Sequence, residues 1–463
     1  MAYADIVVVG AGPAGIACAV FAASRGRTVV LLDKADRVGG TLYWSGGHVS
    51  AAGTRRQAVR GIADSVEAHY DDIVRISRNT MRADITRLCV EQAVPTVEWL
   101  EDIGFEYDES TPRIVFGHEP YRTARTVHGT KQGLSLLEVL KPQLDAAISS
   151  GHVDLRLGVR ATKLVEADGR VVGIRTDKGD EIVASSVVLA TGGFGHNPEL
   201  FAELDGAPLV TSAAPTATGD GVHMAREVGA GIAGRGMYIP TFGGLPPKPG
   251  ELRVDWVNRP HLVAPERPPW EIYVDRDGQR WIDEDEPSID CKERALTTIP
   301  EMTFWQVFDA RALRESHPIV HGWTAEELHA QCGVRRGVER APTLEELARQ
   351  SGINADGLVR TVARYNDHVA AGCDSDFGRG FLPAPIAEPP FYAIENHPVT
   401  LITFAGVDVD SDLRVRREDG TAVEGLYAIG ELIGSAAYNG NSFCSGMSLT
   451  PALALGRLLG LRL

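Results

Sequence analysis

Gly10-Ala11-Gly12-Pro13-Ala14-Gly15 is the stretch that decides the fold. It follows the β-branched run at residues 5–9, which is typical of a buried parallel strand, and it opens an alanine-rich helix expected over residues 16–24. A second strand is expected over residues 28–32 and ends at Asp33. This order of strand, glycine turn, helix and strand predicts the βαβ unit of a dinucleotide-binding domain.

Each glycine of this stretch has a separate physical role. Gly10 makes the tight turn after the strand, Gly12 lets the backbone approach a pyrophosphate, and Gly15 lets the helix pack closely on the strand. The free N–H groups at the start of the helix attract phosphate. Asp33 is placed to accept hydrogen bonds from ribose hydroxyls. The unit therefore predicts a bound dinucleotide.

A second glycine-rich stretch follows the ribose-binding acid. Gly39-Gly40 and Gly46-Gly47 lie shortly after Asp33, and a simple NAD domain has no such stretch. Further along the chain, four more short blocks stand where an expected strand ends or an expected helix begins. They are Ala190-Thr191-Gly192, Thr218-Gly219-Asp220-Gly221, Gly430-Glu431 and the run from Asn441 to Leu449.

In their order and rough spacing, these blocks resemble the fumarate reductase/succinate dehydrogenase flavoprotein superfamily (FAD-dependent oxidoreductase 2) over essentially the whole chain. The resemblance implies FAD as the cofactor. Because no His lies between Gly40 and Ser45, we expect the FAD to be bound non-covalently. The residues expected to contact it are Gly10, Gly12, Pro13, Ala14, Gly15, Asp33, Lys34, Gly40, Thr41, Ser45, Gly46, Gly47, Ala161, Ala190, Thr191, Gly192, Asp220, Gly430, Glu431, Ser445, Ser448 and Leu449.

The fold expected from these features is α/β with two domains. With 463 residues the chain is longer than a single core usually holds. We expect a Rossmann-like FAD-binding domain, with a parallel sheet and a β-hairpin layer, over residues 1–235 and 376–463. Residues 236–375 are rich in Pro and aromatic residues and then in helical patterns, and they are expected to form an inserted α+β capping domain over the flavin.

Three motifs of fumarate chemistry are absent. The superfamily's fumarate and succinate enzymes use an Arg proton donor, a His pair and a further Arg to meet two carboxylates. Residues 278–288 have no Arg where the acid catalyst is expected, residues 401–406 have no His, and residues 441–443 have no Arg. Because unpaired substrate carboxylates are costly to bury, the sequence argues against fumarate reduction.

The closest resemblance within the superfamily is to ketosteroid dehydrogenase-like members and other cyclic-ketone desaturases. It is carried by residues 441–449, Asn-Ser-Phe-Cys-Ser-Gly-Met-Ser-Leu, in which Phe443 takes the place of a catalytic Tyr. It implies a dehydrogenase that introduces an α,β double bond next to the ketone of a cyclic substrate, steroid-like or a small oxocyclohexane ring. In this hypothesis Gly446 N–H and Ser445 polarise the ketone, a Tyr takes the α-proton, and flavin N5 takes the hydride.

Several tyrosines could be the base. Tyr121 is the first candidate, because it lies in a polar loop expected between two helices. Tyr238 is the second. Tyr43 and Tyr438 are further candidates for the base. A structural role is the first expectation for the other candidates, which are His118 and Arg125 of the Tyr121 loop, His48, which could face the flavin, and the cap residues Arg259, Arg267 and His261, which could meet a single carboxylate.

Two other functions stay open at this point. The same half-reaction run backwards would make the protein a reductase of an activated alkene. A flavoprotein electron-transfer subunit of a larger complex is a third possibility, although a stand-alone enzyme is expected. As a dehydrogenase the protein needs an external electron acceptor such as oxygen, a quinone or an artificial dye.

Composition narrows the partners and the compartment. A formal net charge of -16 argues against nucleic acid as a partner. The six Cys are scattered and show no metal-ligand spacing, so we expect no metal site. We expect the thiols to be reduced, as in a cytoplasmic protein. Neither a targeting segment nor an apolar run long enough to span a membrane is seen.

Overall fold

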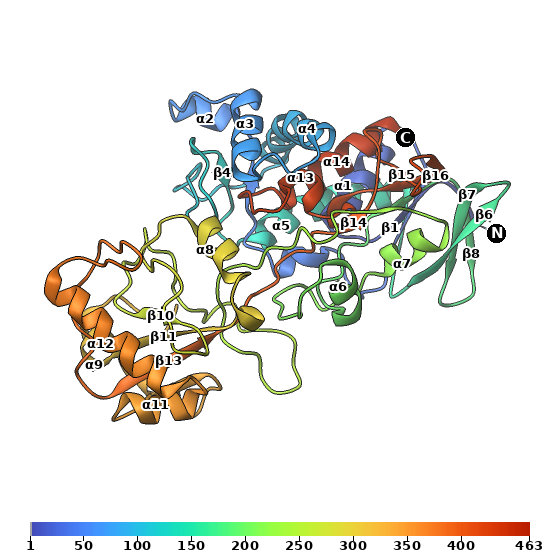
Figure 1. Ribbon diagram of the computed structural model, residues 1–463. Helices are drawn as coiled ribbons and strands as arrows, with labels where there is room; N and C mark the ends of the chain where they lie inside the picture. The colour runs from blue at the N-terminus through green and yellow to red at the C-terminus, as the bar shows by residue number, and fades with distance from the viewer. Residues whose placement is uncertain (1) are drawn as a thin grey trace.

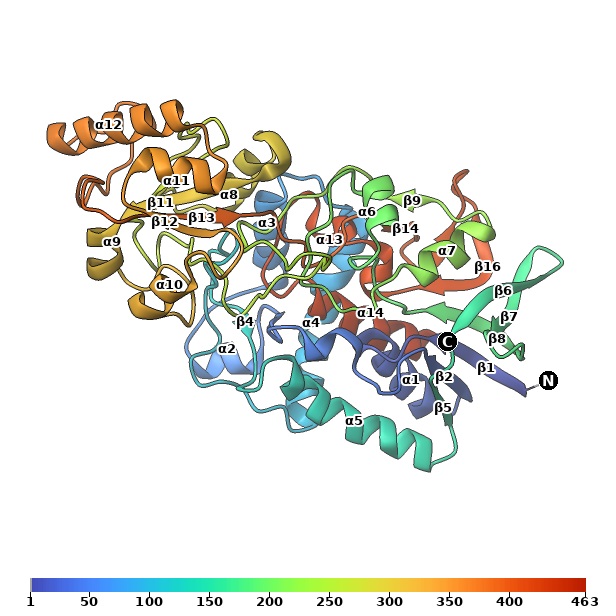
Figure 2. The same cartoon turned by 90° about the horizontal axis from the view of Figure 1, so that it is seen from below.

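The computed structural model describes residues 2–463 and has two lobes. Figures 1 and 2 both place the helices α9–α12 at one end of the molecule and the strands β6–β8 at the other. The lobe that holds β6–β8 contains both ends of the chain. The other lobe is formed by one inserted segment, as expected for a cap.

The larger lobe is built on an eight-stranded sheet whose main order is β15-β16-β7-β8-β1-β2-β5. β1 (Ala2–Val9) lies between β2 (Val29–Asp33) and β8 (Glu181–Leu189) and runs parallel to both. β16 (Ala422–Ala428) runs parallel to β8 on its other side, and β5 (Val153–Leu157) pairs with β2. The register pairs Val9 with both Leu32 and Leu189, so the ends of these three strands meet at one edge of the sheet.

The expected hairpin layer is also present. β6 (Ala161–Ala167), β7 (Arg170–Thr176) and β8 form an antiparallel run. The Rossmann-like FAD-binding fold is thus confirmed. Its remaining elements are η1 (Gly40–Tyr43), β3 (Val49–Ser50), α2 (Arg55–Val59), α3 (Val66–Ile76), α4 (Ala83–Asp102), β4 (Thr126–Val127), α5 (Gly133–Ser149), α6 (Pro198–Leu204), α7 (Asp220–Glu227), β9 (Ile232–Ala233), β14 (Gly406–Val407), β15 (Arg414–Arg416), η3 (Gly430–Ile433) and α13 (Ala436–Asn439).

Helices α1 (Pro13–Ser24) and α14 (Leu449–Arg462) pack closely against each other. A Cβ atom on Gly456 of α14 would lie 2.4 Å from the carbonyl oxygen of Ala14, and one on Gly460 would lie 2.4 Å from that of Cys18. Only glycine permits this approach of two backbones. Since each of the two helices starts at the ligand edge of the sheet, their contact fixes two N-termini relative to each other.

The cap is a four-stranded antiparallel sheet, β10-β11-β13-β12, covered by helices. The predicted boundary at residue 375 is wrong, because β13 (Phe391–Asn396) pairs with β11 and β12 inside the cap sheet. The hydrophobic pattern could not assign this strand to a domain, because a strand of the cap sheet and a strand of the FAD-binding domain have the same pattern. The other cap elements are β10 (Ile272–Val274), α8 (Ile289–Leu296), η2 (Pro300–Met302), β11 (Phe304–Asp309), α9 (Ala310–Glu315), α10 (Ala325–Gln331), β12 (Val338–Ala341), α11 (Leu344–Ser351) and α12 (Ala355–Ala371).

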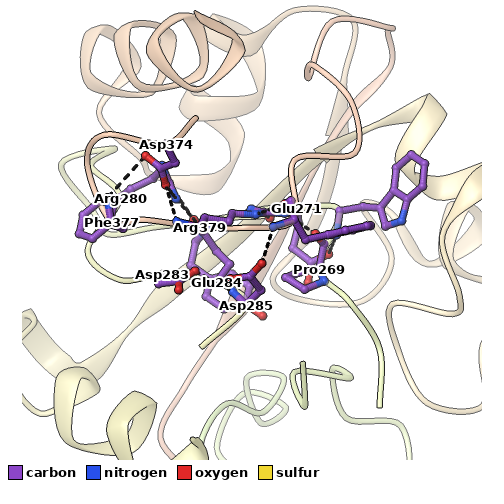
Figure 3. A network of polar contacts seen from close by, with 12 residues as sticks. Pro269, Glu271, Arg280, Asp283, Glu284, Asp285, Asp374, Phe377 and Arg379 are labelled. Carbon is purple, nitrogen blue, oxygen red and sulfur yellow. Dashed lines mark hydrogen bonds and ion pairs between the residues drawn. The ribbon is translucent and has the colours of Figure 1, made fainter. Parts of the chain in front are cut away.

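A buried ion network holds the cap together (Figure 3). Arg280 donates to both oxygens of Glu284, at 2.8 and 2.6 Å, and to Asp374 at 2.9 Å. Arg379 Nη1 lies 3.3 Å from Glu284 Oε2, and all four side chains are at most 4% exposed. The network ties the stretch after β10 to the segment that follows α12.

The cap is expected to lose stability when Asp374 is protonated. Burial opposes ionisation of this carboxyl, but hydrogen bonds from Arg280 and the Asp376 N–H lower its pKa to about 2. A pKa lowered on folding stabilises the protein above the unfolded value of about 4, and that contribution is lost as the pH falls from about 4 toward 2. The free energy of unfolding, measured by denaturant titration between pH 5 and pH 3, should therefore depend less on pH in Asp374→Asn. Equal slopes in the two proteins would contradict this expectation.

Candidate active site

A long cavity opens at the edge of the sheet where β1, β8 and β16 end. All but three of the residues expected to contact FAD line it. The three exceptions are Gly15, Gly47 and Ser445, which lie behind the wall. Stretches far apart in the sequence thus meet around one cavity. Which of these residues contacts FAD stays a prediction.

The middle of the cavity is shaped for phosphate. Gly10 has φ +107°, and a Cβ atom there would lie 2.4 Å from the Ala190 carbonyl oxygen. A Cβ atom on Gly15 would lie 1.8 Å from the Gly10 carbonyl oxygen, whereas one on Gly12 would meet nothing within 4 Å. Gly12 caps α1 without any side-chain hydrogen bond, so the helix N-terminus faces the cavity free to attract an anion. Thr191 Oγ1 is buried here and has no hydrogen-bond partner among residues 2–463. These features fit a pyrophosphate and its ribose.

One end of the cavity is polar and suits the adenosine half. The two oxygens of Asp33 accept separate hydrogen bonds from the N–H groups of Ala11, at 2.7 Å, and Ala35, at 2.8 Å. Lys34 and Arg160 line the same end, and both are ion-paired with Asp220, at 3.1 and 2.8 Å. The backbone therefore holds Asp33 in place, and both cations are ion-paired with Asp220.

The other end of the cavity is aromatic and apolar. It is lined by the side chains of Trp44, His48, His118, Trp256, Leu401, Ile402, Phe443 and Cys444. Burial lowers the pKa of His118 to about 4. Burial, together with His128, Arg113 and His118, lowers that of His48 to about 4 as well. Both imidazoles are thus neutral at pH 7. No Lys or Arg is among the residues that line this end, although the guanidinium of Arg253 stacks on the Trp44 ring, 3.7 Å from its centroid.

Glu431 and Gly446 flank the cavity from the C-terminal blocks. Glu431 Oε1 accepts hydrogen bonds from Thr403 N–H, at 2.9 Å, and from its hydroxyl, at 3.1 Å, and burial raises the pKa of Glu431. Gly446 has φ +75°, and a Cβ atom there would lie 2.3 Å from Ser50 Oγ. The Gly446 N–H has no partner among the described residues and remains available to a bound ligand.

Three of the four predicted catalytic residues do not line the cavity. The Tyr121 hydroxyl donates to the Ser445 carbonyl oxygen at 2.8 Å, and burial raises the pKa of Tyr121 well above its ordinary value. The Tyr238 hydroxyl lies 3.0 Å from Thr400 Oγ1, and burial likewise raises the pKa of Tyr238. Ser445 Oγ accepts a hydrogen bond from Thr126 at 3.1 Å. The hydroxyls of Tyr121 and Thr126 thus hold the Ser445 loop, and that of Tyr238 pairs with Thr400. These partners argue against the expected contact of the three residues with a substrate, whereas Gly446 lines the cavity and its role stays a prediction.

The weaker candidates mostly have structural partners. Arg125 is fully buried between Asp64 and Asp72, and Arg267 is paired with Glu271 at 2.6 Å. His261 lies 3.4 Å from Glu266, and Arg259 donates to the Trp256 carbonyl at 3.1 Å. The Arg37 guanidinium lies 3.9 Å from the centroid of the Tyr43 ring, and Tyr438 is buried.

Two lining residues, His48 and His118, are only weaker candidates in the sequence, and others carry no signal there. His48 directly follows Gly46-Gly47, which was the one available signal for its position, although a structural role seemed the safer interpretation. His118 was ranked below Tyr121, three positions away in the same loop. Trp256 lies in the cap and carries no local motif, and Ile402 lies in the stretch 401–406, which the sequence marks only by its lack of His.

Comparisons with known proteins agree with this geometry. The FAD binding domain family matches residues 5–449. A probable fumarate reductase (Ifc3) from Shewanella frigidimarina is 30% identical over 98% of this chain and 74% of its own length. A urocanate reductase from Eggerthella lenta is 29% identical over 98% of this chain and 74% of its own. The solved structure of 3-ketosteroid-Δ4-(5α)-dehydrogenase from Rhodococcus jostii, in complex with 4-androstene-3,17-dione, is 25% identical with a TM-score of 0.72, covering 99% of this chain and 96% of its own.

The fold and the cavity define a flavoprotein of the fumarate reductase and ketosteroid dehydrogenase type. The chain belongs to the FAD binding domain family, binds FAD, and is an FAD-dependent oxidoreductase that acts on carbon–carbon single or double bonds. None of the helices formed by residues 2–463 combines the length and the apolar character that crossing a bilayer requires.

Proposed function

We propose that the protein oxidises a neutral cyclic ketone, steroid-like or a small oxocyclohexane ring, by introducing a double bond between the α- and β-carbons. The observation that carries this proposal is the charge of the cavity. Among its lining residues the only Lys and Arg are Lys34 and Arg160, and both are ion-paired with Asp220 at the adenosine end. No Lys or Arg is among the residues that line the aromatic end.

This cavity disfavours a dicarboxylate. Burying an ionised carboxylate without a partner costs several kcal/mol, and a dicarboxylate would incur this cost twice. Ser288 lies four residues after Glu284, near where the acid catalyst of fumarate enzymes is expected, and it donates to Glu119. Ser442 lies where those enzymes have a further Arg, and it donates to Asp290 at 2.7 Å. Neither hydroxyl offers a positive charge.

A ketone fits the groups that remain. Bound FAD supplies the acceptor for the hydride removed from the β-carbon. The free N–H of Gly446 would donate a hydrogen bond to the ketone oxygen, which acidifies the α-carbon. The rings of Trp256 and Phe443 and the side chain of Ile402 would enclose an apolar ring and exclude water. An external acceptor such as oxygen, a quinone or a dye would reoxidise the protein.

Anaerobic reduction of the yellow protein tests the direction and the substrate class. Cyclohexanone and 5α-androstane-3,17-dione are each mixed with oxidised protein, and the loss of flavin absorbance is followed. We expect at least one of the two ketones to bleach the flavin. Failure of every ketone, together with reoxidation of the reduced protein by 2-cyclohexen-1-one, would overturn the proposed direction.

The second candidate is a reductase of a neutral activated alkene. It is favoured by relatives that are named as reductases, of fumarate and of urocanate. The same cavity serves both directions, because the reverse reaction passes through the same transition state. Reoxidation of the reduced protein by 2-cyclohexen-1-one that is much faster than bleaching by cyclohexanone would select this candidate.

A further inference from the structure

His118 combines three properties that a proton-transferring group needs. It lies in the loop between α4 and α5 and lines the aromatic end of the cavity. Neither of its ring nitrogens has a hydrogen-bond partner in the part of the chain that the structure describes, and Nδ1 is buried. Buried polar groups in folded proteins are nearly always paired, so an unpaired imidazole that faces a ligand cavity points to a function.

The position of His118 relative to Phe443 gives that function a location. The imidazole stacks on the Phe443 ring, with centroids 5.1 Å apart and an angle of 25° between the planes. Phe443 stands at the position of the catalytic Tyr in the ketosteroid dehydrogenases that residues 441–449 resemble. The imidazole of His118 therefore lies next to the position at which those dehydrogenases have a Tyr hydroxyl and this chain has none. The Tyr121 hydroxyl is not free, because it donates to the Ser445 carbonyl.

His48 is the other neutral imidazole in the cavity, but its surroundings suit the role less well. His128 lies 5.2 Å from it between ring centroids, and Arg113 also opposes a positive charge on it. No cation among the described residues opposes protonation of His118, for which burial alone disfavours the charged form. A proton that arrives from a substrate is thus accommodated better on His118.

We propose that His118 moves the proton at the α-carbon of the substrate. This inference rests on the proposed function. In oxidation the α-carbon–hydrogen bond breaks and its proton goes to the free nitrogen of His118. The electron pair of that bond forms the new double bond as the β-hydrogen leaves with two electrons for the oxidised flavin. In alkene reduction protonated His118 returns the proton, so the assignment holds in either direction.

The test compares His118→Gln with His48→Gln and with His223→Gln, which alters an exposed histidine on α7. Stopped-flow absorbance follows flavin reduction by cyclohexanone and, in dithionite-reduced protein, reoxidation by 2-cyclohexen-1-one. Loss of a general acid or base costs about 10²–10⁴-fold. We expect His118→Gln to show that loss, and to lose the pH dependence of the rate, in whichever direction the wild type reacts. His223→Gln should match the wild type.

A second readout needs no substrate. Deuterium exchange at the imidazole C2 position, followed residue by residue with mass spectrometry, gives the protonation midpoint of each histidine. In the oxidised holoprotein His118 should titrate well below the ordinary value, and its midpoint should rise when dithionite reduces the flavin. An ordinary midpoint that reduction does not change would overturn the proposal, even if the wild type reacts with neither probe.

The outcomes separate this inference from the proposed function. Reaction of the wild type in the reductive direction only would overturn the proposed function, while the loss in His118→Gln would still support the role of His118. A full rate in His118→Gln, or the large loss in His48→Gln alone, would overturn that role and leave the neutral-ketone proposal standing.

Discussion

A Gly15→Ala variant is expected to lose its bound FAD and to unfold more easily than the wild type. The new Cβ atom would lie 1.8 Å from the Gly10 carbonyl oxygen and 3.3 Å from a methyl group of Val8. Because the Gly10 carbonyl belongs to the backbone and cannot turn aside, helix α1 must move away from β1. Overpacking of this kind costs about 1–3 kcal/mol or more, and it displaces the helix N-terminus that faces the pyrophosphate. Flavin content after purification and the midpoint of thermal unfolding measure the two effects.

Gly12→Ala is the matched control for Gly15→Ala. Gly12 has φ -77°, which alanine adopts freely, and a Cβ atom there meets no protein atom within 4 Å. Its methyl group would enter the cavity instead. We expect the apoprotein to keep wild-type stability while FAD binding weakens by roughly tenfold or more. Equal stability losses in the two variants would contradict the separation of a packing glycine from a ligand-facing one.

Replacing Arg125 is expected to have the second large effect. Its guanidinium donates to both oxygens of Asp64, at 3.0 Å each, and to Asp72 at 2.9 Å, and the three side chains are at most 1% exposed. Arg125→Met would leave the buried carboxylate of Asp64 without a cation, whereas Asp72 would keep Arg75 at 3.1 Å. Removing one partner of a buried ion pair costs about 3–5 kcal/mol, so denaturant titration should show a large drop in the free energy of unfolding.

Two further variants separate charge from packing at Arg125. Adding Asp64→Asn to Arg125→Met should recover part of the stability, because no unpaired carboxylate is then buried. Lys141→Met removes an exposed ion pair with Asp145, and it should change stability little. If the double variant is no more stable than Arg125→Met alone, the loss comes from packing rather than from buried charge.

The FAD-binding domain could be predicted from local sequence because its elements carry their own signals. The glycines at positions 10, 12 and 15 specify a turn, a close approach and a helix contact, and each requirement is visible in the sequence itself. Cofactor contacts were predictable for the same reason. The turns after parallel strands meet at one edge of the sheet, so motifs distant in sequence converge there.

The cap boundary and the catalytic residues were harder to predict. β13 reads as an ordinary strand, and only its pairing with β11 shows that the cap continues to Asn396. Tyr121 and His118 lie in one irregular loop, where no periodicity tells which side chain faces a cavity. The loop turns the phenol toward the Ser445 carbonyl and leaves the imidazole in the cavity. Such orientation depends on tertiary packing rather than on residue type.

The charge of the substrate is tested most directly by titrating the oxidised holoprotein with small ligands while recording the flavin absorbance spectrum. Cyclohexanone is compared with succinate and with fumarate over the same concentration range. If the aromatic end of the cavity holds a neutral ketone, cyclohexanone shifts the spectrum with a saturable dependence and neither dicarboxylate does. Saturable binding of succinate or fumarate, tighter than that of cyclohexanone, would contradict a neutral substrate.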